Sequence, residues 1–482
     1  MMTRGYNFIG GEWVAGARSA PNINPSDTRD VIGEYALADL TQARSAVDAA
    51  ATAFPAWSRT GSQQRFDILD KAGTEILARS AELGDLLARE EGKTLPEAVG
   101  EVVRAGQIFK FFAGEALRLH GEVLPSVRPG IGVEVTREPL GVVSLITPWN
   151  FPIAIPAWKI APALAFGNCV VFKPAELVPG SAWALAEILY RSGLPDGVFN
   201  LVMGAGAEVG PALVNDARVA GVSFTGSVAT GRHLAAACAA RGARYQLEMG
   251  GKNPLVVLDD ADLAVAVQCA VMGSFYSTGQ RCTASSRLII TDGIHDRFIE
   301  SMIERMKQLK VDGARYPGTD IGPVVDERQL AVDMDYIGVA QTEGATLAFG
   351  GQHHATNGRG EPGHYLTPAL LTGTDNGMRI NQEEVFGPVA SVIRARDYEE
   401  ALGIANDTPF GLSSGLCTTS LKHATHFKRH AQAGMVMVNT PTAGVDYHVP
   451  FGGRKGSSMG PREQGSYAAE FYTTVKTAYT AA

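Results

Sequence analysis

The chain has 482 residues, of which 45% are apolar and 19% charged, and this composition is typical of a globular protein with two or three domains. Its net charge is −8, so the chain has no excess of basic residues and we do not expect nucleic acid as a partner. The five cysteines are odd in number and never spaced as Cys-x-x-Cys, which argues against a disulfide framework or a zinc knuckle and favours a reducing, cytoplasmic location.

The first part of the chain is predicted to begin with short strands and to continue as helices. Residues 1–7 contain no long apolar core, so no signal peptide is expected there. Residues 7–35 mix short apolar runs with Pro, Asn and Ser, a pattern typical of strands and turns. From about Leu40 to Gly121, alanine-rich amphipathic runs predict helices. Residues 131–143 then alternate apolar and polar side chains, as a hairpin or an edge ribbon would.

Residues 141–172 are strongly apolar and carry a single charge, Lys159. A membrane helix needs about 20 consecutive apolar residues, whereas four prolines interrupt this stretch. We therefore expect a buried strand, loop, helix and strand here, and no membrane partner. Across residues 141–258, short apolar runs alternate with helical ones, which predicts a parallel sheet with helices on both faces.

A second α/β block is predicted from about Leu255 to Val438. Its helices are expected at residues 296–309, 327–343 and 398–406. Residues 467–479 are rich in Tyr, Thr and Val and predict one strand. An isolated strand has to pair with another strand, and a second subunit could supply that partner.

The loop at residues 279–286 places Cys282 between a Gly-Gln turn and a run of small hydroxyl residues. Because a helical run precedes the loop and an apolar strand follows it, the thiol can meet a substrate. The chemistry needs a thiolate, which an unperturbed cysteine with a pKa of about 8.5 supplies only in small amount at neutral pH. We expect Arg281 and exposed backbone N–H groups to raise the thiolate fraction. Taken alone, such a cysteine is more often a small buried side chain.

Two further segments contain side chains suited to catalysis. Glu248 precedes a Gly-Gly turn at the end of a predicted strand, and a glutamate in apolar surroundings has a raised pKa and makes a usable general base. Asn150 lies between Pro148 and Pro152, which fix the backbone, and its amide is a suitable donor to a developing oxyanion. By themselves, a surface glutamate and a turn asparagine fit the two positions as well.

Two segments could contact a nucleotide. Residues 224–231 follow a strand and open a helix, where a diphosphate meets free N–H groups, but they match neither the Gly-x-Gly-x-x-Gly fingerprint nor a Walker loop. Lys173 and Glu176 come directly after a predicted strand and could hold the two hydroxyls of a ribose. The competing interpretation is a solvated ion pair. Neither segment identifies a nucleotide unaided.

A metal site is not expected. His423, His426 and His430 could share one helix face. The lysines and the arginine that lie among them would repel a cation, so a solvated helix is the better interpretation.

Taken together and in order, these motifs resemble the NAD(P)-dependent aldehyde dehydrogenase superfamily. The resemblance extends from Gly11 over nearly the whole chain. Its motifs are P-W-N-F-P (148–152), K-P-A-E (173–176), F-T-G-S (224–227), L-E-x-G-G-K (247–252), G-Q-x-C (279–282), E-V-F-G-P (384–388) and P-F-G-G-R-K (450–455). Seven blocks in the family's order make the resemblance highly specific.

The resemblance implies the catalytic roles. Cys282 is implied as the nucleophile that attacks the aldehyde carbonyl, with Asn150 and the backbone N–H of Cys282 stabilising the oxyanion. Hydride transfer then leaves a thioester, and Glu248 is implied as the base that activates the hydrolysing water. CoA-acylating relatives lack this base, so Glu248 favours the hydrolytic, acid-forming route.

The resemblance also implies the cofactor residues, namely Ile146, Thr147, Trp149, Lys173, Glu176, Gly226, Ser227, Gly231, Glu384 and Phe386. Lys173 and Glu176 match contacts to the adenine ribose, and Ser227 with the helix after it matches the diphosphate site. Glu384 matches the ligand of the nicotinamide ribose, with Phe386 near the ring. A carboxylate at Glu176 would repel a 2′-phosphate, which favours NAD over NADP. NADP stays possible because Lys173 could offset part of that repulsion.

The fold implied by the resemblance is an α/β protein with three parts. A doubly wound, parallel-sheet NAD-binding domain is assigned to residues 1–122 and 141–252, and a second α/β, catalytic domain to residues 253–450. A small β ribbon for oligomerisation is assigned to residues 123–140 and 461–482. The family implies a homodimer or a homotetramer.

Residues 173–188 and 460–479 are most similar to a bacterial branch of the family, the α-ketoglutaric semialdehyde (2,5-dioxopentanoate) dehydrogenases. This implies a small-molecule substrate, 2,5-dioxopentanoate, that is oxidised to 2-oxoglutarate. Succinic semialdehyde dehydrogenases typically carry an arginine six residues before the nucleophile, where this chain has Tyr276, although Arg281 could bind a carboxylate by another route. An aromatic or general aldehyde remains an alternative. The residues suggested for the substrate pocket are Phe151, Trp158, Tyr276, Arg281 and Phe451.

Two other classes of protein stay open. A cysteine hydrolase without redox chemistry would use the same thiol but would show no aldehyde-dependent reduction of NAD. A non-catalytic relative would require a lost site, whereas Cys282, Glu248 and Asn150 are all present.

Overall fold

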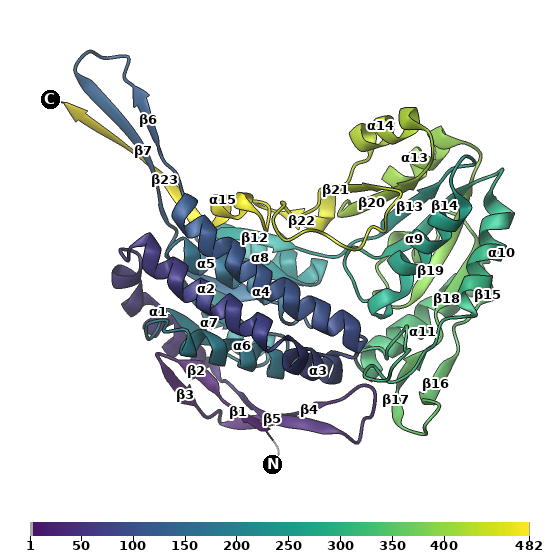
Figure 1. Ribbon diagram of the computed structural model, residues 1–482, viewed down its shortest axis with the longest axis horizontal. Helices are drawn as coiled ribbons and strands as arrows, with labels where there is room; N and C mark the ends of the chain where they lie inside the picture. Colours follow the sequence, from purple (N-terminus) through teal and green to yellow (C-terminus); the bar gives the residue numbers. More distant parts are fainter. Residues whose placement is uncertain (1–2, 482) are drawn as a thin grey trace.

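The computed structural model describes residues 3–481 (Figure 1). Residues 1, 2 and 482, which belong to the predicted N-terminal and C-terminal segments, lie outside the described residues. The helices are α1 (Leu40–Trp57), α2 (Ser62–Ala78), α3 (Ser80–Glu91), α4 (Leu95–Arg118), α5 (Ala154–Ala165), α6 (Pro179–Arg191), α7 (Gly206–Asn215), α8 (Val228–Ala240), α9 (Leu263–Phe275), α10 (His295–Met306), α11 (Glu327–Thr342), α12 (Arg379–Gln382), α13 (Tyr398–Asn406), α14 (Leu421–His430) and α15 (Ala469–Tyr472).

Within the described residues, the first sheet contains eight strands in the order β22-β12-β11-β8-β9-β10-β2-β3. Its parallel strands are β8 (Val142–Ile146), β9 (Cys169–Lys173), β10 (Phe199–Leu201), β11 (Val219–Thr225) and β12 (Arg244–Glu248). Antiparallel strands close both edges, namely β2 (Asn7–Ile9), β3 (Glu12–Val14) and β22 (Ser458–Met459). The strand–helix alternation predicted for residues 141–258 is confirmed.

The second sheet has the order β15-β18-β19-β14-β13-β20-β21. Its strands are β13 (Asn253–Val257), β14 (Ser285–Thr291), β15 (Thr346–Phe349), β18 (Ala369–Thr374), β19 (Val389–Ala395), β20 (Ser413–Cys417) and β21 (Met435–Val438). All neighbours are parallel except β15 and β18. The hairpin of β16 (His353–Thr356) and β17 (Pro362–Leu366) extends from this part of the chain. The predicted second α/β block is therefore present.

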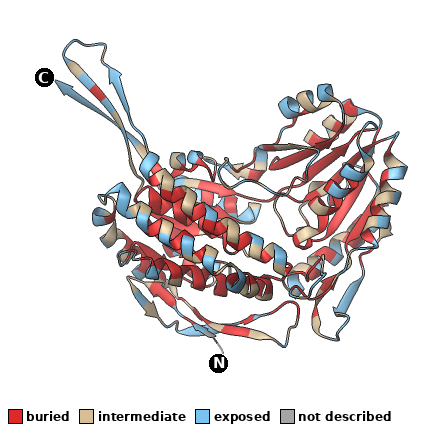
Figure 2. Ribbon diagram, viewed as in Figure 1, coloured by how far each residue is buried: buried red, intermediate tan, exposed pale blue. Residues whose placement is uncertain are grey.

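Two small sheets complete the described chain. The first joins β1 (Thr3–Gly5), β5 (Val31–Leu37) and β4 (Arg18–Ile23). The second is an arm made of β6 (Glu122–Pro125), β7 (Ile131–Pro139) and β23 (Thr473–Ala481), which projects from the molecule and is largely exposed (Figures 1 and 2). The predicted C-terminal strand exists as β23 and pairs with β7 of the same chain along its whole length.

The segment between β22 and β23 does not join this arm. Phe471 and Tyr472 are 0% and 1% exposed and belong to the core around the first sheet. Residues 461–472, which the sequence assigned to the ribbon, therefore pack against the first sheet, and only residues 473–481 of that range extend the arm.

The apolar stretch at residues 141–172 forms β8, a loop, α5 and β9, as predicted. Every side chain of α5 is buried, because the helix packs between the first sheet and α4. No helix within residues 3–481 is long and apolar enough to cross a membrane.

Helix α4 links the core to the site. Its N-terminus is fixed by a capping box in which Thr94 and Glu97 satisfy each other's backbone N–H groups. One face buries Val102, Phe109 and Phe112 completely, and each such side chain contributes roughly 1.5–3 kcal/mol of burial. That face packs against α2 and α5 and so holds α4 in place. Glu97 and Arg104 of the same helix are thereby held toward the loop that carries Cys282.

Candidate active site

Cys282 lies on the loop between α9 and β14. Three consecutive residues before it, Ser277, Thr278 and Gly279, have positive φ angles of 50°, 56° and 66°. A Cβ at Gly279 would lie 2.2 Å from the carbonyl oxygen of Gly387, so only glycine fits this turn. Asn253 then fixes the loop, because its Nδ2 donates to the carbonyl oxygen of Cys282 (2.7 Å).

Cys282 is shared by two cavities. The first has a volume of about 290 Å³ and lies at the carboxyl ends of the strands of the first sheet. The second has a volume of about 310 Å³ and lies between α4, α5 and the loop that carries the cysteine. Only Cys282 and Ile155 line both. A group bound in one cavity therefore meets a group bound in the other at the thiol.

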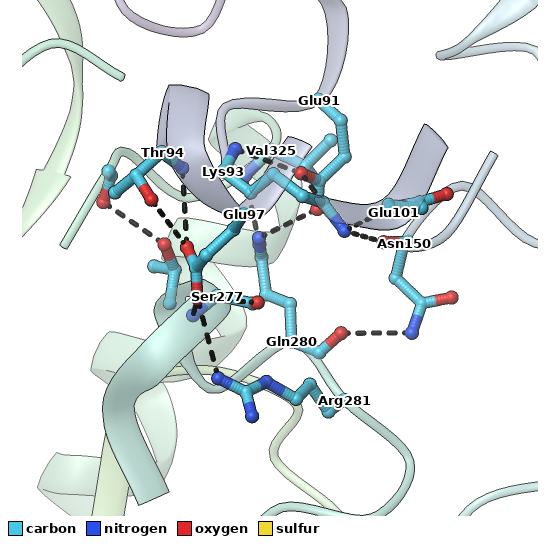
Figure 3. Close-up of polar contacts among 12 residues, drawn as sticks. Glu91, Lys93, Thr94, Glu97, Glu101, Asn150, Ser277, Gln280, Arg281 and Val325 are labelled. Atoms are coloured by element: carbon cyan, nitrogen blue, oxygen red, sulfur yellow. Dashed lines mark hydrogen bonds and ion pairs between the residues drawn. The ribbon is translucent and has the colours of Figure 1, made fainter. Parts of the chain in front are cut away.

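Asn150 lines the first cavity and is 2% exposed. Its Nδ2 donates to the carbonyl oxygen of Gln280 (2.9 Å), while its Oδ1 is buried without a partner. The amide is thus attached to the loop of the cysteine, two residues before the thiol (Figure 3). This arrangement places an amide donor beside Cys282, as an oxyanion site requires.

A buried ion-pair network supports the Asn150 loop from α4 (Figure 3). The Nζ of Lys93 donates to Glu101 (2.9 Å) and to the carbonyl oxygen of Asn150 (2.6 Å). The other oxygen of Glu101 accepts from the backbone N–H groups of Ile153 and Ala154 (3.0 Å each), at the start of α5. The network thereby fixes the backbone on both sides of the asparagine. The sequence analysis missed it, since a lysine and a glutamate eight residues apart form no recognisable motif.

Glu248 ends β12 and is 2% exposed. It accepts a hydrogen bond from the hydroxyl of Ser458, and it lines neither cavity. Burial, together with the negative charge of Glu463, raises the pKa of Glu248 well above its usual range. A carboxylate of this kind accepts protons readily near neutral pH, which suits a general base.

The surroundings of the thiol correct one expectation. Burial, followed by the charges of Glu384 and Glu248, raises the pKa of the Cys282 thiol to about 12. The charge of Arg281 does not outweigh these effects, and its guanidinium lies 3.5 Å from the carboxylate of Glu97. The prediction that Arg281 raises the thiolate fraction is therefore wrong for this structure, since a neighbour in sequence is not the nearest charge in space.

The first cavity contains five of the predicted cofactor residues, which are Trp149, Gly226, Ser227, Glu384 and Phe386. Glu384 accepts from the backbone N–H of Gly251 (2.9 Å), and burial raises its pKa to about 7. Phe386 has a φ of 69° and packs edge-on against Trp149, with 5.4 Å between ring centroids. A strained non-glycine residue at a cavity wall is characteristic of a ligand site.

The remaining predicted cofactor residues, Ile146, Thr147, Lys173, Glu176 and Gly231, do not line this cavity. Ile146 pairs with Lys173 across adjacent strands, and Lys173 lies 3.7 Å from Glu176, whose carboxylate accepts from the N–H of Gly206 (3.0 Å). Gly231 instead faces Met249, because a Cβ there would lie 2.4 Å from its sulfur. Four of the five thus extend along the strand ends from the cavity toward α7.

These surroundings fit a dinucleotide. The side-chain oxygens of Asn150, Thr225 and Thr147 are buried without partners, and the first two residues line the cavity, so polar groups of a ligand are needed there. Ser227 is the N-cap of α8, and the free N–H groups of the first turn follow it. The ends of parallel strands are also the usual place for such a ligand.

The second cavity contains all five residues suggested for the substrate pocket, which are Phe151, Trp158, Tyr276, Arg281 and Phe451. Trp158 stacks on Phe451, with 5.5 Å between ring centroids. The cavity also contains Glu97 and Arg104 from α4, which the sequence analysis did not consider. Their only signal in the sequence is that two charged residues seven positions apart share one face of a helix.

Comparison with known proteins gives a consistent result. The aldehyde dehydrogenase family matches residues 13–478. The chain is 42% identical to an alpha-ketoglutaric semialdehyde dehydrogenase of Bacillus subtilis, over 98% of this chain and 97% of that protein. It is 43% identical to an alpha-ketoglutarate semialdehyde dehydrogenase of Haloferax volcanii, over 98% of both. The crystal structure of a betaine aldehyde dehydrogenase from Staphylococcus aureus in complex with NAD+ superposes with a TM-score of 0.96 at 34% identity, over 99% of this chain and 95% of that chain.

Proposed function

The chain belongs to the aldehyde dehydrogenase family, and on that premise we propose that it oxidises 2,5-dioxopentanoate to 2-oxoglutarate with NAD. It is an NAD(P)-dependent oxidoreductase that acts on aldehydes. One observation carries the proposal: Cys282 lies where a cavity suited to a dinucleotide meets a cavity lined by aromatic side chains and two arginines. The relatives named above for α-ketoglutarate semialdehyde support the choice of substrate.

In the first half-reaction the thiol of Cys282 releases its proton to water and its sulfur attacks the aldehyde carbon, so that a C–S bond forms while the carbonyl oxygen becomes an alkoxide. The amide of Asn150 and the backbone N–H of Cys282 stabilise that oxygen. The hydride of this adduct would pass to NAD held in the first cavity, which is the chemistry that the cofactor would supply. A thioester remains on Cys282.

In the second half-reaction Glu248 takes a proton from water, whose oxygen attacks the thioester carbon. The C–S bond breaks, 2-oxoglutarate leaves, and the sulfur of Cys282 takes the proton from Glu248, which restores both the thiol and the base. The raised pKa of Glu248 supports this role. Because the carboxylate is turned to Ser458 and lines neither cavity, it acts through water rather than by direct contact with the aldehyde.

The residues that would hold the cofactor follow the ends of the strands. Glu384 and Phe386 would hold the nicotinamide ribose and ring, and Ser227 with the start of α8 would hold the diphosphate. Lys173 and Glu176 would hold the adenine ribose. The carboxylate of Glu176 supports a preference for NAD, because it would repel a 2′-phosphate at this place.

Aromatic side chains around an aldehyde site could also suit a quaternary ammonium, as in betaine aldehyde. Two ring faces in this pocket already have cations of the chain beside them. The Nζ of Lys93 lies 3.7 Å from the ring centroid of Phe151, and the guanidinium of Arg104 lies 5.7 Å from that of Trp158. Since a further cation would be repelled, an anionic aldehyde is the better substrate class.

The test is kcat/KM, with NAD and with NADP, for 2,5-dioxopentanoate, succinic semialdehyde, benzaldehyde and betaine aldehyde. We expect the dioxo acid with NAD to lead by at least tenfold, equivalent to ~1.4 kcal/mol of transition-state preference. A lead for benzaldehyde or betaine aldehyde would contradict the substrate. Ester cleavage without any aldehyde-dependent absorbance of NADH would instead support a cysteine hydrolase.

Assembly and location complete the proposal. The exposed arm leaves Val123, Val475 and Tyr479 open to solvent, which supports a homodimer or a homotetramer built on this arm. All five cysteines are free, which supports a reducing, cytoplasmic compartment.

A further inference from the structure

Two arginines line the cavity around Cys282, and they differ in their partners. Arg281 lies 3.5 Å from the carboxylate of Glu97, and the same oxygen of Glu97 also accepts from the N–H of Ser277 (2.8 Å) (Figure 3). The charge of Arg281 is therefore balanced inside the protein. A substrate carboxylate would have to compete with Glu97 for it.

Arg104, on α4, has no such partner. Its Nη2 donates to the neutral side chain of Gln464 (3.1 Å), and its Nε is buried without any hydrogen-bond acceptor. None of the ion pairs formed among residues 3–481 includes it. The carboxylates whose charges act on it are those of Glu101 and Asp446, and Glu101 is already paired with Lys93.

A half-buried cation without a counter-ion is unfavourable, and burial accordingly lowers the pKa of Arg104. Such a group is stabilised when an anion arrives. Because a guanidinium presents parallel N–H groups, the matching anion is a carboxylate, which it binds with two hydrogen bonds. The cavity that Arg104 lines is the one that contains the thiol.

We propose that Arg104 binds the carboxylate of the aldehyde substrate and thereby selects semialdehydes of dicarboxylic acids. The aldehyde carbon lies at Cys282, and the C1 carboxylate at the opposite end of the substrate lies at Arg104. The aromatic walls formed by Trp158 and Phe451 enclose the methylene chain between them. This inference rests on the proposed function and names the residue that gives it its substrate class.

A purely structural role makes a different prediction. If the only role of Arg104 were its hydrogen bond to Gln464, the side chain would serve to hold the C-terminal segment against α4. Its loss would then slow all aldehydes alike. The charge of the substrate separates the two roles.

The experiment compares Arg104→Met with the wild-type enzyme on 2,5-dioxopentanoate and on pentanal, an uncharged aldehyde of the same chain length, at saturating NAD. We expect kcat/KM for the dioxo acid to fall about 100-fold and that for pentanal to change less than about threefold. Arg104→Lys keeps the charge but loses the second hydrogen bond, so it should retain part of the preference. Arg281→Met is the matched control, and it should leave the ratio of the two substrates unchanged.

A second readout does not depend on turnover. Glutarate, a dicarboxylate without an aldehyde, should protect Cys282 of the wild-type protein from iodoacetamide and should fail to protect the Arg104→Met variant. Equal losses on both substrates with protection retained would overturn the inference. If the wild-type enzyme shows no preference for 2,5-dioxopentanoate over the other semialdehydes, the proposed function fails. The role of Arg104 is then still tested with succinic semialdehyde against butanal.

Discussion

At the scale of single residues, burial and the charges of two glutamates outweigh the arginines that line the cavity at Cys282. Burial is the largest influence on its pKa, and the charges of Glu384 and Glu248 add to it. The protein without cofactor therefore holds the nucleophile in its neutral form at physiological pH. This state protects the thiol from oxidation and alkylation, both of which require the thiolate.

The alkylation rate of Cys282 should show this directly. With a pKa of about 12, the rate of iodoacetamide labelling without cofactor should rise about tenfold per pH unit from pH 7 to pH 10, with no plateau. An unperturbed cysteine would level off above its pKa of about 8.5. Glu384→Gln removes one of the negative charges that raise the pKa of the thiol, so it should make labelling faster at pH 8. A labelling rate that reaches a plateau near pH 9 in the wild-type protein would contradict the raised pKa of Cys282.

Glu248 is the proposed base of the second half-reaction. In Glu248→Gln we expect a burst of one NADH per active site and then a steady rate lower by about 10²–10⁴-fold, because the thioester forms but is not hydrolysed. Its raised pKa sets the sign of the pH dependence, since the base form is lost as pH falls. The wild-type steady-state rate should therefore decline as the pH falls through the pKa of Glu248, and this decline should lie at a higher pH than an ordinary carboxyl group would give. The variant should lack that decline, and stopped-flow absorbance at 340 nm would show both.

At the scale of elements, the site depends on how α4 is attached to the start of α5. Lys93 and Glu101 bracket the beginning of α4, and through them the helix holds the backbone of Asn150 and the first turn of α5. The asparagine is thus positioned by side chains from a helix about fifty residues earlier in the chain. Lys93 is a positioning residue, since it does not line either cavity.

Lys93→Met should show this coupling. The substitution leaves Glu101 and Glu91 buried without their cation, so the free energy of unfolding should fall by about 3–5 kcal/mol. Displacement of Asn150 should lower kcat more than it raises KM, because the oxyanion is affected rather than the bound aldehyde.

The matched control is Lys110→Met, also on α4. Its ion pair with Asp70 (2.7 Å) is partly exposed, so the loss should be below about 1 kcal/mol, with kcat unchanged. Thermal unfolding and steady-state kinetics measure both effects. Equal behaviour of the two variants would show that Lys93 has no special role.

At the scale of the whole molecule, the arm of β6, β7 and β23 is the least buried part of the described chain (Figure 2). Val475 and Tyr479 are 59% and 63% exposed. They are four residues apart on one strand and therefore share a face. An arm with apolar side chains on its surface needs a partner to cover it.

Val475→Asp combined with Tyr479→Asp should therefore lower the oligomeric state. We expect the mass in solution, measured by light scattering, to fall to that of a monomer or a smaller oligomer, because buried carboxylates destabilise an apolar interface. Lys476→Asp with Thr480→Asp changes charge on the opposite face of the same strand and serves as the comparison. If the wild-type protein is itself monomeric in solution, the proposal that the arm forms a subunit interface is wrong.

The sequence by itself determined the catalytic chemistry and most of the fold. The proposed nucleophile, base and amide donor each lie in a short contiguous motif, and such motifs can be recognised in the sequence because the backbone alone fixes their neighbours. The alternation of strands and helices could be predicted as well, since the parallel strands are buried on both faces and therefore appear in the sequence as apolar runs. The five suggested pocket residues also line one cavity, and three of them, Phe151, Arg281 and Phe451, belong to the motifs themselves.

Only the tertiary structure decided which charges face one another. Arg281 is adjacent to Cys282 in sequence but pairs with Glu97, whereas Arg104 reaches the same cavity from a helix 178 positions earlier and has no carboxylate partner. The pKa of the thiol likewise follows from burial and from Glu384, which lies about a hundred residues away in the chain. Electrostatic interactions depend on distance through space and on burial, and neither quantity is fixed until distant elements have packed.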